Sequence, residues 1–323
     1  MKILLIGATG QIGYALVHAL AKTGHEITAL VRAVGNLSFP ESITVVVEPN
    51  FTGAVFERLL PEADCAIYGV GLPEQFAFDK QIFERVNLKL LQTFLVAMGK
   101  SGLRRLVYIS TYEVFAAQNG VIRESHPTAE PDGLTPYFSA MIKAYVEVTA
   151  FAKRTALTTI HPAALYGGLD TSGGFTSVIE NMLNWRVWKL PVILPGQFPL
   201  VHAESLAKAI VLALEHEGSF IVSDGMCSLK QLAHTLHRQV RSYVPPEVPA
   251  GLAYAATAPI EAIGRALRIR PIFCKVQLDF ITSGSEPLAD HASQVLGWKP
   301  WSLEDGLRQY LADRAELLAA RPA

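Results

Sequence analysis

The segment IGATGQIG, residues 6–13, lies between a short apolar run and a helical pattern, and it decides the fold class. Gly7, Gly10 and Gly13 have the spacing GxxGxxG. In such a loop the first glycine allows a tight turn, the second lets a pyrophosphate approach the backbone, and the third lets helix and strand pack closely. Free N–H groups at the start of the helix then face the phosphates. The segment therefore predicts a strand–loop–helix unit that binds a dinucleotide.

The residues after this loop repeat the alternation of strand and helix. Short β-branched runs alternate with helical patterns, which is typical of parallel strands joined by helices. The expected strands are residues 2–7, 25–32, 43–48, 64–70, 103–111 and 157–167. The expected helices are residues 11–23, 80–100 and the segment TPYFSAMIKAYVE at 135–147. We therefore expect an α/β fold with a Rossmann-type doubly wound parallel sheet.

The pattern changes after residue 167. Glycine-rich and proline-rich segments follow, with an isolated strand expected at 219–224 and an amphipathic helix at 228–240. We interpret residues 1–167 as the dinucleotide-binding domain. Residues 168–323 are mainly a smaller, mixed α/β lobe that binds the substrate at the carboxyl side of the sheet, although some later segments return to the first domain.

The charge balance restricts the classes of partner. The chain has 323 residues, with 28 Lys and Arg against 29 Asp and Glu, and a formal net charge of −1. This balance predicts neither a nucleic-acid partner nor a basic surface for anionic lipid. Cys65, Cys227 and Cys274 are far apart, so neither a disulfide framework nor a metal site is expected. The expected location is the reducing cytoplasm.

No apolar run reaches the ~18 residues that a membrane span needs. The nearest is residues 248–267, which contains Pro259, Glu261 and Arg265. We interpret it as a helix of the lobe that packs on the core. A helix lying on a membrane surface is the alternative, with basic residues only at its end. The first strand begins at Lys2, so no signal peptide is expected.

The end of the second expected strand distinguishes NADP from NAD. A carboxylate there would bind the adenosine ribose, whereas an arginine accommodates a 2′-phosphate. The sequence has Arg32 at this place and no Asp or Glu before Glu41. A guanidinium can bind a phosphate through two hydrogen bonds. We therefore expect NADP(H), with NAD as the alternative if Arg32 only stacks on the adenine.

Motifs along nearly the whole chain resemble the extended short-chain dehydrogenase/reductase family, which includes proteins similar to NAD-dependent epimerases and dehydratases. The motifs stand in the family's order: GATGQIG, GHEITALVR, ADCAIYGVG, RVNLKLLQTFLVAMGKSGLRRLVYIST, HPAALYGG, LVHAESLAKAIVLAL and ADHASQVLGWKPWSLEDGL. The lobe resembles that of the 3β-hydroxysteroid dehydrogenase and dihydroflavonol reductase branch. The resemblance implies NAD(P)H binding and a catalytic centre of Ser/Thr, Tyr and Lys, assisted by an Asn.

The resemblance also assigns site residues by position. Thr111 falls on the family Ser/Thr, Lys143 on the Lys that binds the nicotinamide ribose, and Asn87 on the assisting Asn. His161 stands where an Arg is usual. The expected cofactor-binding residues are Gly7, Thr9, Gly10, Gln11, Ile12, Gly13, Arg32, Val70, Lys143, Pro162 and Leu165.

The catalytic tyrosine of the family is missing, because its position holds Ser139. A lysine beside a tyrosine lowers the pKa of the phenol, so that the phenol can exchange a proton with a carbonyl or alcohol, and serine lacks that acidity. On a regular helix Tyr137 lies about 240° from Lys143. Tyr137 could serve as the proton donor if the helix starts near Ser139, and otherwise it packs at the helix entrance.

Other side chains could donate the proton or bind the substrate. The segment STYEVF resembles STDEVY of the nucleotide-sugar dehydratases, with Tyr112 in place of the Asp and Glu113 retained. Both would lie at the carboxyl end of a strand, where such sheets bind ligands. Tyr166 and His202 are further candidates from the lobe. Packing or an ordinary polar contact explains each of these residues equally well.

The lobe indicates a substrate without a diphosphate. Phe198 and Pro199 lie near the place where nucleotide-sugar enzymes carry a clamping Arg, and the segment 168–200 has Arg186 and Lys189 as its cations. An apolar pocket favours a small, fairly apolar carbonyl or alcohol. The expected function is therefore an NADP(H)-dependent oxidoreductase with a degenerate YxxxK motif. The alternatives are an NADP(H)-binding sensor or non-redox isomerase or cyclase, and a nucleotide-sugar epimerase or dehydratase. The expected partner is a small molecule, and a homodimer is left open.

Overall fold

The centre of this computed structural model is a sheet of seven parallel strands in the order β10-β7-β5-β4-β1-β2-β3. The structure describes residues 1–73, 77–132, 134–152, 155–168, 175–184, 192–269, 271 and 274–319. The strand order reverses between β1 and β4, which is where doubly wound sheets bind ligands. The strands are β1 (Lys2–Ile6), β2 (Glu26–Val31), β3 (Ile43–Val47), β4 (Cys65–Tyr68), β5 (Arg105–Ile109), β7 (Ala156–Pro162) and β10 (Gly218–Val222). The predicted Rossmann-type sheet is confirmed.

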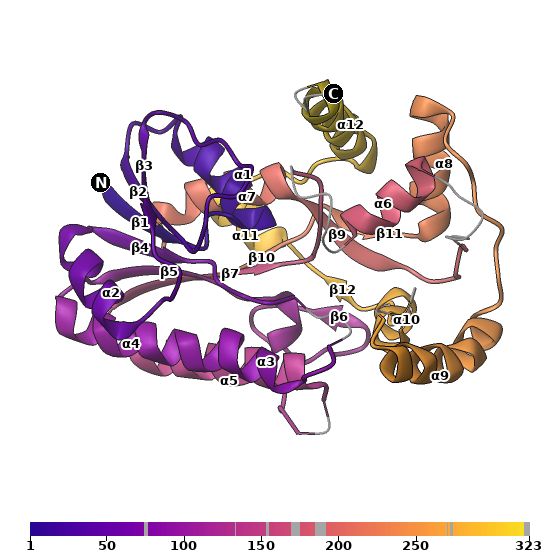
Figure 1. Ribbon diagram of the computed structural model, residues 1–323, viewed down its shortest axis with the longest axis horizontal. Coiled ribbons are helices and arrows are strands. Elements are labelled where there is room, and N and C mark those ends of the chain that lie inside the picture. The colour runs from indigo at the N-terminus through magenta and orange to yellow at the C-terminus, as the bar shows by residue number, and fades with distance from the viewer. Residues whose placement is uncertain are drawn as a thin grey trace.

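Two helical layers cover the sheet, because successive side chains of a strand point to opposite faces. In β1, Ile3 and Leu5 pack in one buried cluster, whereas Leu4 and Ile6 pack in another. The first layer contains α1 (Gln11–Leu20), α7 (Ala203–Leu212) and α11 (Asp290–Leu296). The second contains α2 (Gly53–Leu59), α4 (Leu90–Ser101) and α5 (Pro136–Phe151), with α3 (Gln81–Phe83) and a π-helical segment (Glu84–Lys89) leading into α4. Figure 1 shows α1 and α7 on one side of the sheet and α2, α4 and α5 on the other.

Two expected strands differ from the structure. The run at 219–224 is no isolated strand of the lobe, because β10 pairs in parallel with β7 and forms the edge of the central sheet. The run at 157–167 divides at Ala163, whose N–H donates to the carbonyl of Val222 at 2.9 Å. Residues before Ala163 form β7, and those after it form β8 (Ala164–Tyr166) in a different sheet. The sequence LTTIHPAALYG reads as a single strand and does not indicate this change of sheet.

The lobe is built on a three-stranded sheet of β8, β9 (Phe198–His202) and β11 (Gly225–Cys227). Its buried cluster includes Phe175 and Phe198, with ring centroids 4.4 Å apart. Arg186 and Lys189 lie outside the described residues. The helices of this part are α6 (Thr176–Leu183), α8 (Leu229–Val240), α9 (Ala250–Leu267), α10 (Lys275–Thr282) and α12 (Leu303–Ala319), and the short strands β6 (Val121–Ile122) and β12 (Glu286–Pro287) pair with each other.

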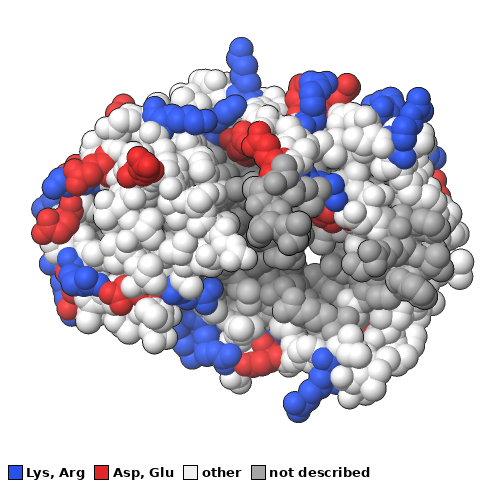
Figure 2. Space-filling model, turned by 45° about the horizontal axis from the view of Figure 1, so that its top comes forward, with Lys and Arg blue, Asp and Glu red and all other residues white. Residues whose placement is uncertain are grey.

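The surface carries both signs of charge. On the face drawn in Figure 2, acidic and basic side chains are interspersed around the rim. Among the residues that the structure describes, no helix combines the length and apolarity needed to cross a bilayer.

Candidate functional site

The glycine loop joins β1 to α1 at the switch point of the sheet. Gly7 has a φ of 96°, which side chains rarely allow. A Cβ on Gly13 would lie 2.1 Å from the carbonyl oxygen of Gly7, so α1 can approach the strand only because residue 13 has no side chain. A Cβ on Gly10 would meet only that same oxygen, at 3.6 Å, so the loop is open on this side. No side chain caps α1, which leaves its first N–H groups for an anion. These features fit a pyrophosphate.

Gln11 links this loop to the lobe. Its Nε2 donates to the carbonyl of Gly167 at 2.7 Å and lies 2.9 Å from Thr176 Oγ1 at the start of α6. The side chain is thus engaged by protein, and only its backbone remains for a phosphate. Of its neighbours in the loop, Thr9 is half-buried and Ile12 packs against the first core cluster.

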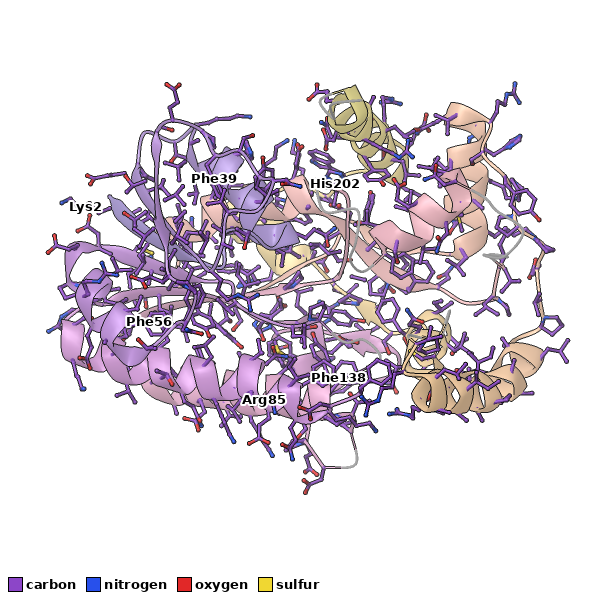
Figure 3. All side chains as sticks on the ribbon, viewed as in Figure 1. Lys2, Phe39, Phe56, Arg85, Phe138 and His202 are labelled. Carbon is purple, nitrogen blue, oxygen red and sulfur yellow. The ribbon has the colours of Figure 1, made fainter. Side chains whose placement is uncertain are left out.

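Arg32 directly follows β2, on the strand next to β1. Its side chain is exposed, and none of the described residues forms a hydrogen bond or ion pair with it. The segment after it is held over α1, because Tyr14 donates to the carbonyl of Ser38 at 2.8 Å and its ring packs edge-on against Phe39. Figure 3 shows Phe39 beside α1. The guanidinium therefore stands free at the place predicted for a 2′-phosphate.

Asn87 holds the loop that follows β4. It is buried in the π-helical segment, its Oδ1 accepts from the N–H of Leu72 at 2.7 Å, and its Nδ2 donates to the carbonyl of Leu72 at 3.0 Å. Val70, on the same loop, lies beside Gly7: its Cγ2 is 3.2 Å from where a Cβ on Gly7 would be. The amide of Asn87 thus fixes the segment that faces the glycine loop.

The helix that carries the degenerate motif is regular from its start. Thr135 caps α5 by accepting from the N–H of Phe138, and the N–H of Ser139 donates to the carbonyl of Thr135 at 3.0 Å. Tyr137 therefore belongs to the first helical turn, and its ring packs edge-on against Phe83 with centroids 5.9 Å apart. Lys143 lies one turn after Ser139 and is exposed. The late helix start that would bring Tyr137 to Lys143 is absent.

Thr111 follows β5, and its backbone is fixed by a buried histidine. His161 Nδ1 donates to the carbonyl of Thr111 at 3.1 Å, while its Nε2 lies 2.8 Å from Thr159 Oγ1. Complete burial lowers the pKa of His161 to about 4, so the ring is neutral. The rings of Phe115 and Tyr145 pack against it, with centroids 4.6 and 5.2 Å away. His161 thus positions Thr111 through its main chain, a role that the sequence pattern did not indicate.

A hydroxyl and a carboxylate meet at the same strand end. Thr111 Oγ1 donates to Glu113 Oε2 at 3.1 Å. Tyr112, between them, is buried, and burial raises its pKa well above the usual value for a phenol, with the charge of Glu113 and a hydrogen bond to it adding to the effect. Tyr112 therefore stays protonated, which is the opposite of the acidified phenol in a YxxxK site. The structure brings Thr111, Tyr112 and Glu113 together.

The lobe candidates Tyr166 and His202 are buried, with exposures of 1% and 0%. His202 caps α7 by accepting from the N–H of Glu204, and its ring stacks on Trp301 with centroids 5.0 Å apart. Burial lowers the pKa of His202 to about 4 and raises that of Tyr166 beyond its usual range. Pro162 ends β7 in the interior, and Leu165 of β8 is half-buried. Their assignment to cofactor or substrate stays a prediction.

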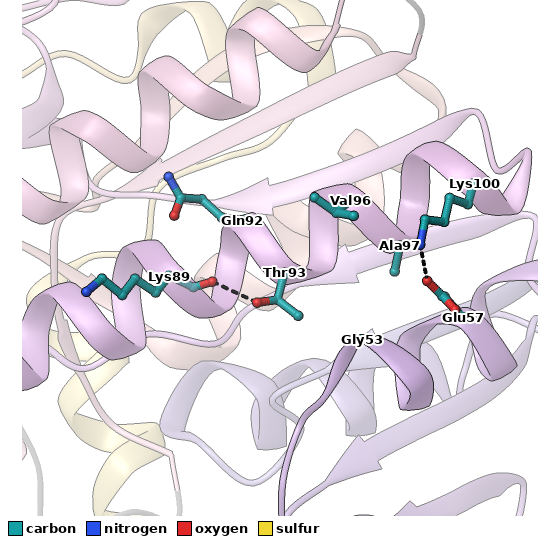
Figure 4. A pocket seen from close by; sticks show the side chains of 8 residues that line it. All are labelled: Gly53, Glu57, Lys89, Gln92, Thr93, Val96, Ala97 and Lys100. Atoms are coloured by element: carbon teal, nitrogen blue, oxygen red, sulfur yellow. Dashed lines mark hydrogen bonds and ion pairs between the residues drawn. The ribbon is translucent and has the colours of Figure 1, made fainter.

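Two surface hollows lie elsewhere. One, of about 560 Å³, lies between α2 and α4, where Lys100 pairs with Glu57 at 2.6 Å and Thr93 donates to the carbonyl of Lys89 (Figure 4). The other, of about 510 Å³, is lined by residues 123–125, by Ser219 of β10 and by residues of α11. Neither is lined by a site residue predicted from the sequence. Among the described residues, no cluster of His, Cys, Asp and Glu could hold a metal ion.

A family model describes this combination of sheet and glycine loop. The model of the NAD dependent epimerase/dehydratase family matches residues 3–222. The chain belongs to this family. The match spans the seven central strands and the β5 and α5 residues discussed above. The chain is therefore an NAD(P)-dependent enzyme of the extended short-chain dehydrogenase/reductase type.

Curated relatives include enzymes of different activity. The chain is 27% identical over 327 residues to a 3-diazoavenalumate denitrifying reductase from a Streptomyces species, covering 95% of this chain and 99% of the relative. It is 23% identical over 270 residues to sterol demethylase protein B of Methylococcus capsulatus, covering 78% and 80%.

Solved structures share the fold at low identity. UDP-glucuronic acid 4-epimerase from Bacillus cereus, in complex with UDP-glucuronic acid and NAD, has a TM-score of 0.76 at 17% identity, over 98% of this chain and 100% of that one. UDP-glucose 4-epimerase from Thermotoga maritima, with UDP-glucose, has a TM-score of 0.75 at 18% identity, over 98% and 100%. At this identity the likeness concerns the fold alone.

Proposed function

We propose that the chain is an NADP(H)-dependent reductase or dehydrogenase of a small, fairly apolar substrate. The observation that carries the proposal is the free, exposed guanidinium of Arg32 at the end of β2, beside an open glycine loop. NADP(H), when bound, supplies or accepts the hydride. The glycine loop would hold its pyrophosphate, Arg32 its 2′-phosphate and Lys143 its nicotinamide ribose.

The proton of a carbonyl reduction would come from the end of β5. Thr111 Oγ1, already paired with Glu113, would bind the substrate oxygen, and a proton that the Glu113 carboxylate takes up from water would pass through that hydroxyl to the substrate. The carbonyl carbon gains the hydride, its oxygen gains the proton, and the carboxylate left on Glu113 takes up a proton from water. His161 would keep Thr111 in place.

An apolar substrate agrees with the lobe and with the relatives. Phe175, Phe198 and Phe280 have ring centroids 4.4 to 6.0 Å apart in the buried cluster of the lobe. The two relatives described above are named for a diazo compound and for a sterol, and neither name refers to a nucleotide sugar. An apolar, aromatic lobe of this kind disfavours a diphosphate.

Ser139 favours a second substrate class, the aromatic diazonium compounds. When hydride replaces a diazonium group, a C–H bond forms, the C–N bond breaks and N₂ leaves, while the cofactor is oxidised. The product needs no added proton, so the family tyrosine would be dispensable. The denitrifying reductase with 27% identity is named for chemistry on a diazo compound.

The experiment mixes the purified protein and NADPH with ketones, aldehydes, enones and an arenediazonium salt, and follows the absorbance of the reduced nicotinamide. Turnover of a carbonyl compound or of the diazonium salt supports the proposal and selects between the two substrate classes. Tight NADPH binding without turnover of any of them would contradict it and favour a sensor or non-redox role.

A further inference from the structure

Helix α9 exposes most of its length. Of its 18 residues, only Ala253, Thr257 and Gly264 are buried. Large aliphatic side chains are exposed at both ends of the helix region: Leu252 to 65%, Ile263 to 58%, Leu267 to 64% and Ile269 to 60%. Figure 1 shows α9 beside α10 at the end of the lobe farthest from β1 to β3. A surface helix normally turns such residues toward the core.

Two polar side chains of α9 face the protein instead, whereas Arg265 is exposed. Tyr254 donates to Asp279 Oδ1 of α10 at 2.9 Å and lies 2.8 Å from Thr282 Oγ1. Glu261 accepts from the N–H of Lys275 at 2.8 Å, at the start of α10. At about 100° per residue, Tyr254 and Glu261 lie on one side of the helix. On its inward side α9 therefore makes polar contacts with α10, while its large aliphatic side chains are exposed.

The outward side of α9 is continuous and uncharged. Residues at a helical spacing of three and four fall on it, and apart from the half-buried Ala256 they are exposed and apolar: Leu252, Ala255, Pro259, Ala262, Ile263, Ala266 and Leu267. Exposed apolar patches of this kind mark interaction sites. The helix is too short and too firmly tied to α10 by polar contacts to span a bilayer, but an amphipathic helix of this length can lie in the interface.

The charges next to this side select the occupant. The described residues 250–269 contain two Arg against one Glu, in a chain whose formal net charge is −1, and Lys275 of α10 pairs with Asp279 at 2.7 Å. Arg265 and Arg268 are exposed at the end of α9. Cations beside an apolar helix face are typical of binding to anionic lipid headgroups. The overall balance of charge conceals this local excess.

A second copy of the chain is a weaker partner for this face. A helix of 18 residues is about 27 Å long, and its exposed side is roughly 10 Å wide, so each copy would bury on the order of 300 Å². A stable dimer buries about 800 Å² on each partner. We propose that α9 is an interfacial helix that binds the surface of an anionic membrane, with Leu252, Ile263 and Leu267 inserted among the acyl chains. This inference does not depend on the substrate or the cofactor.

The test is sedimentation of the whole protein with vesicles of phosphatidylcholine alone or mixed with phosphatidylglycerol. We expect binding to the mixed vesicles that weakens with salt. The double variant Ile263→Asp/Leu267→Asp should lower the apparent partition coefficient about tenfold or more. The matched control is Val96→Asp, since Val96 is 62% exposed on α4, and it should bind as the native protein does.

A second measurement locates the contact. Ile263→Cys can be labelled with an environment-sensitive fluorophore, because the native cysteines Cys65, Cys227 and Cys274 are buried. Its emission should shift to the blue with anionic vesicles. The proposal is wrong if the native protein stays in the supernatant, if the double Asp variant binds equally well, or if that variant instead converts a dimer into a monomer.

Discussion

The hydroxyl of Thr111 lies 3.1 Å from Oε2 of Glu113, and both residues follow β5 at the carboxyl edge of the sheet. His161 holds the carbonyl of Thr111 from the neighbouring strand, at 3.1 Å. The family places its proton donor on the helix that here is α5, whereas these contacts supply an alternative hydroxyl and carboxylate just after β5. A site with Ser139 in place of the family tyrosine thus still contains a hydroxyl and a carboxyl group that can carry a proton.

Replacing the carboxyl group tests this site. Glu113→Gln keeps the shape and a polar contact to Thr111 but removes the transferable proton. With a carbonyl substrate we expect kcat to fall on the order of 10²-fold or more, with the Kd of NADPH unchanged. Glu147→Gln, an exposed change on α5, is the control. Equal turnover by Glu113→Gln and the native protein would remove Glu113 from the mechanism, unless the substrate is a diazonium compound.

Cofactor preference should depend on Arg32. Arg32→Ala deletes a charge-assisted contact worth ~1.5–3 kcal/mol, so the Kd of NADPH should rise roughly tenfold to a hundredfold and that of NADH should change little. Isothermal titration of both cofactors measures this. Arg58→Ala is the control, because Arg58 is also exposed but pairs with Glu48. A similar loss for both cofactors would contradict the 2′-phosphate assignment.

Lys143 should serve the cofactor without a tyrosine beside it. Lys143→Ala should raise the Kd of NADPH and of NADH together, by roughly tenfold or more, since the ribose is common to both. Lys89→Ala, at an exposed position before α4, should leave both constants unchanged. Unchanged binding in Lys143→Ala would show that the ribose is held elsewhere.

Tyr137→Phe should be nearly neutral. The helix α5 begins at Pro136, and the ring of Tyr137 packs against Phe83, so removing the hydroxyl keeps the packing. We expect turnover within a few-fold of the native rate. A thousandfold loss in kcat with intact NADPH binding would restore Tyr137 as the proton donor.

Much of this site followed from local patterns. The spacing of the glycines and the cation at the end of a strand are patterns that extend over only a few residues of sequence. Gly7, Gly13 and Arg32 lie where those patterns predict. The contacts that organise the remainder join residues far apart in the chain. Gln11 reaches Gly167 and His161 reaches Thr111, and no local periodicity encodes either pairing. The prediction of an isolated strand at 219–224 is wrong for the same reason. This strand pairs with β7, and the intervening residues of the lobe separate the two in the sequence.

Stability should fall in mild acid. Burial lowers the folded-state pKa of His161 and of His202 to about 4, below the usual 6.5, so the unfolded chain binds more protons between these values. The neutral, buried histidines contribute fully to the free energy of unfolding above about pH 6.5. This contribution decreases as the pH falls and is lost below about pH 4. It is on the order of 3 kcal/mol for each histidine. His161→Gln should make the free energy of unfolding less dependent on pH in urea titrations. A dependence as steep as that of the native protein would contradict the assignment.

The central claim is that this chain transfers hydride from NADP(H) to a substrate that leaves as a different compound. NADPH carrying deuterium at C4 of the nicotinamide tests it most directly, with mass spectrometry of the product formed from a carbonyl compound or from the diazonium salt. We predict that deuterium from one face of the nicotinamide appears at the reduced carbon, in equal amount to the NADP⁺ formed. An unlabelled product, or a labelled cofactor that remains unchanged while the substrate is converted, would contradict the claim.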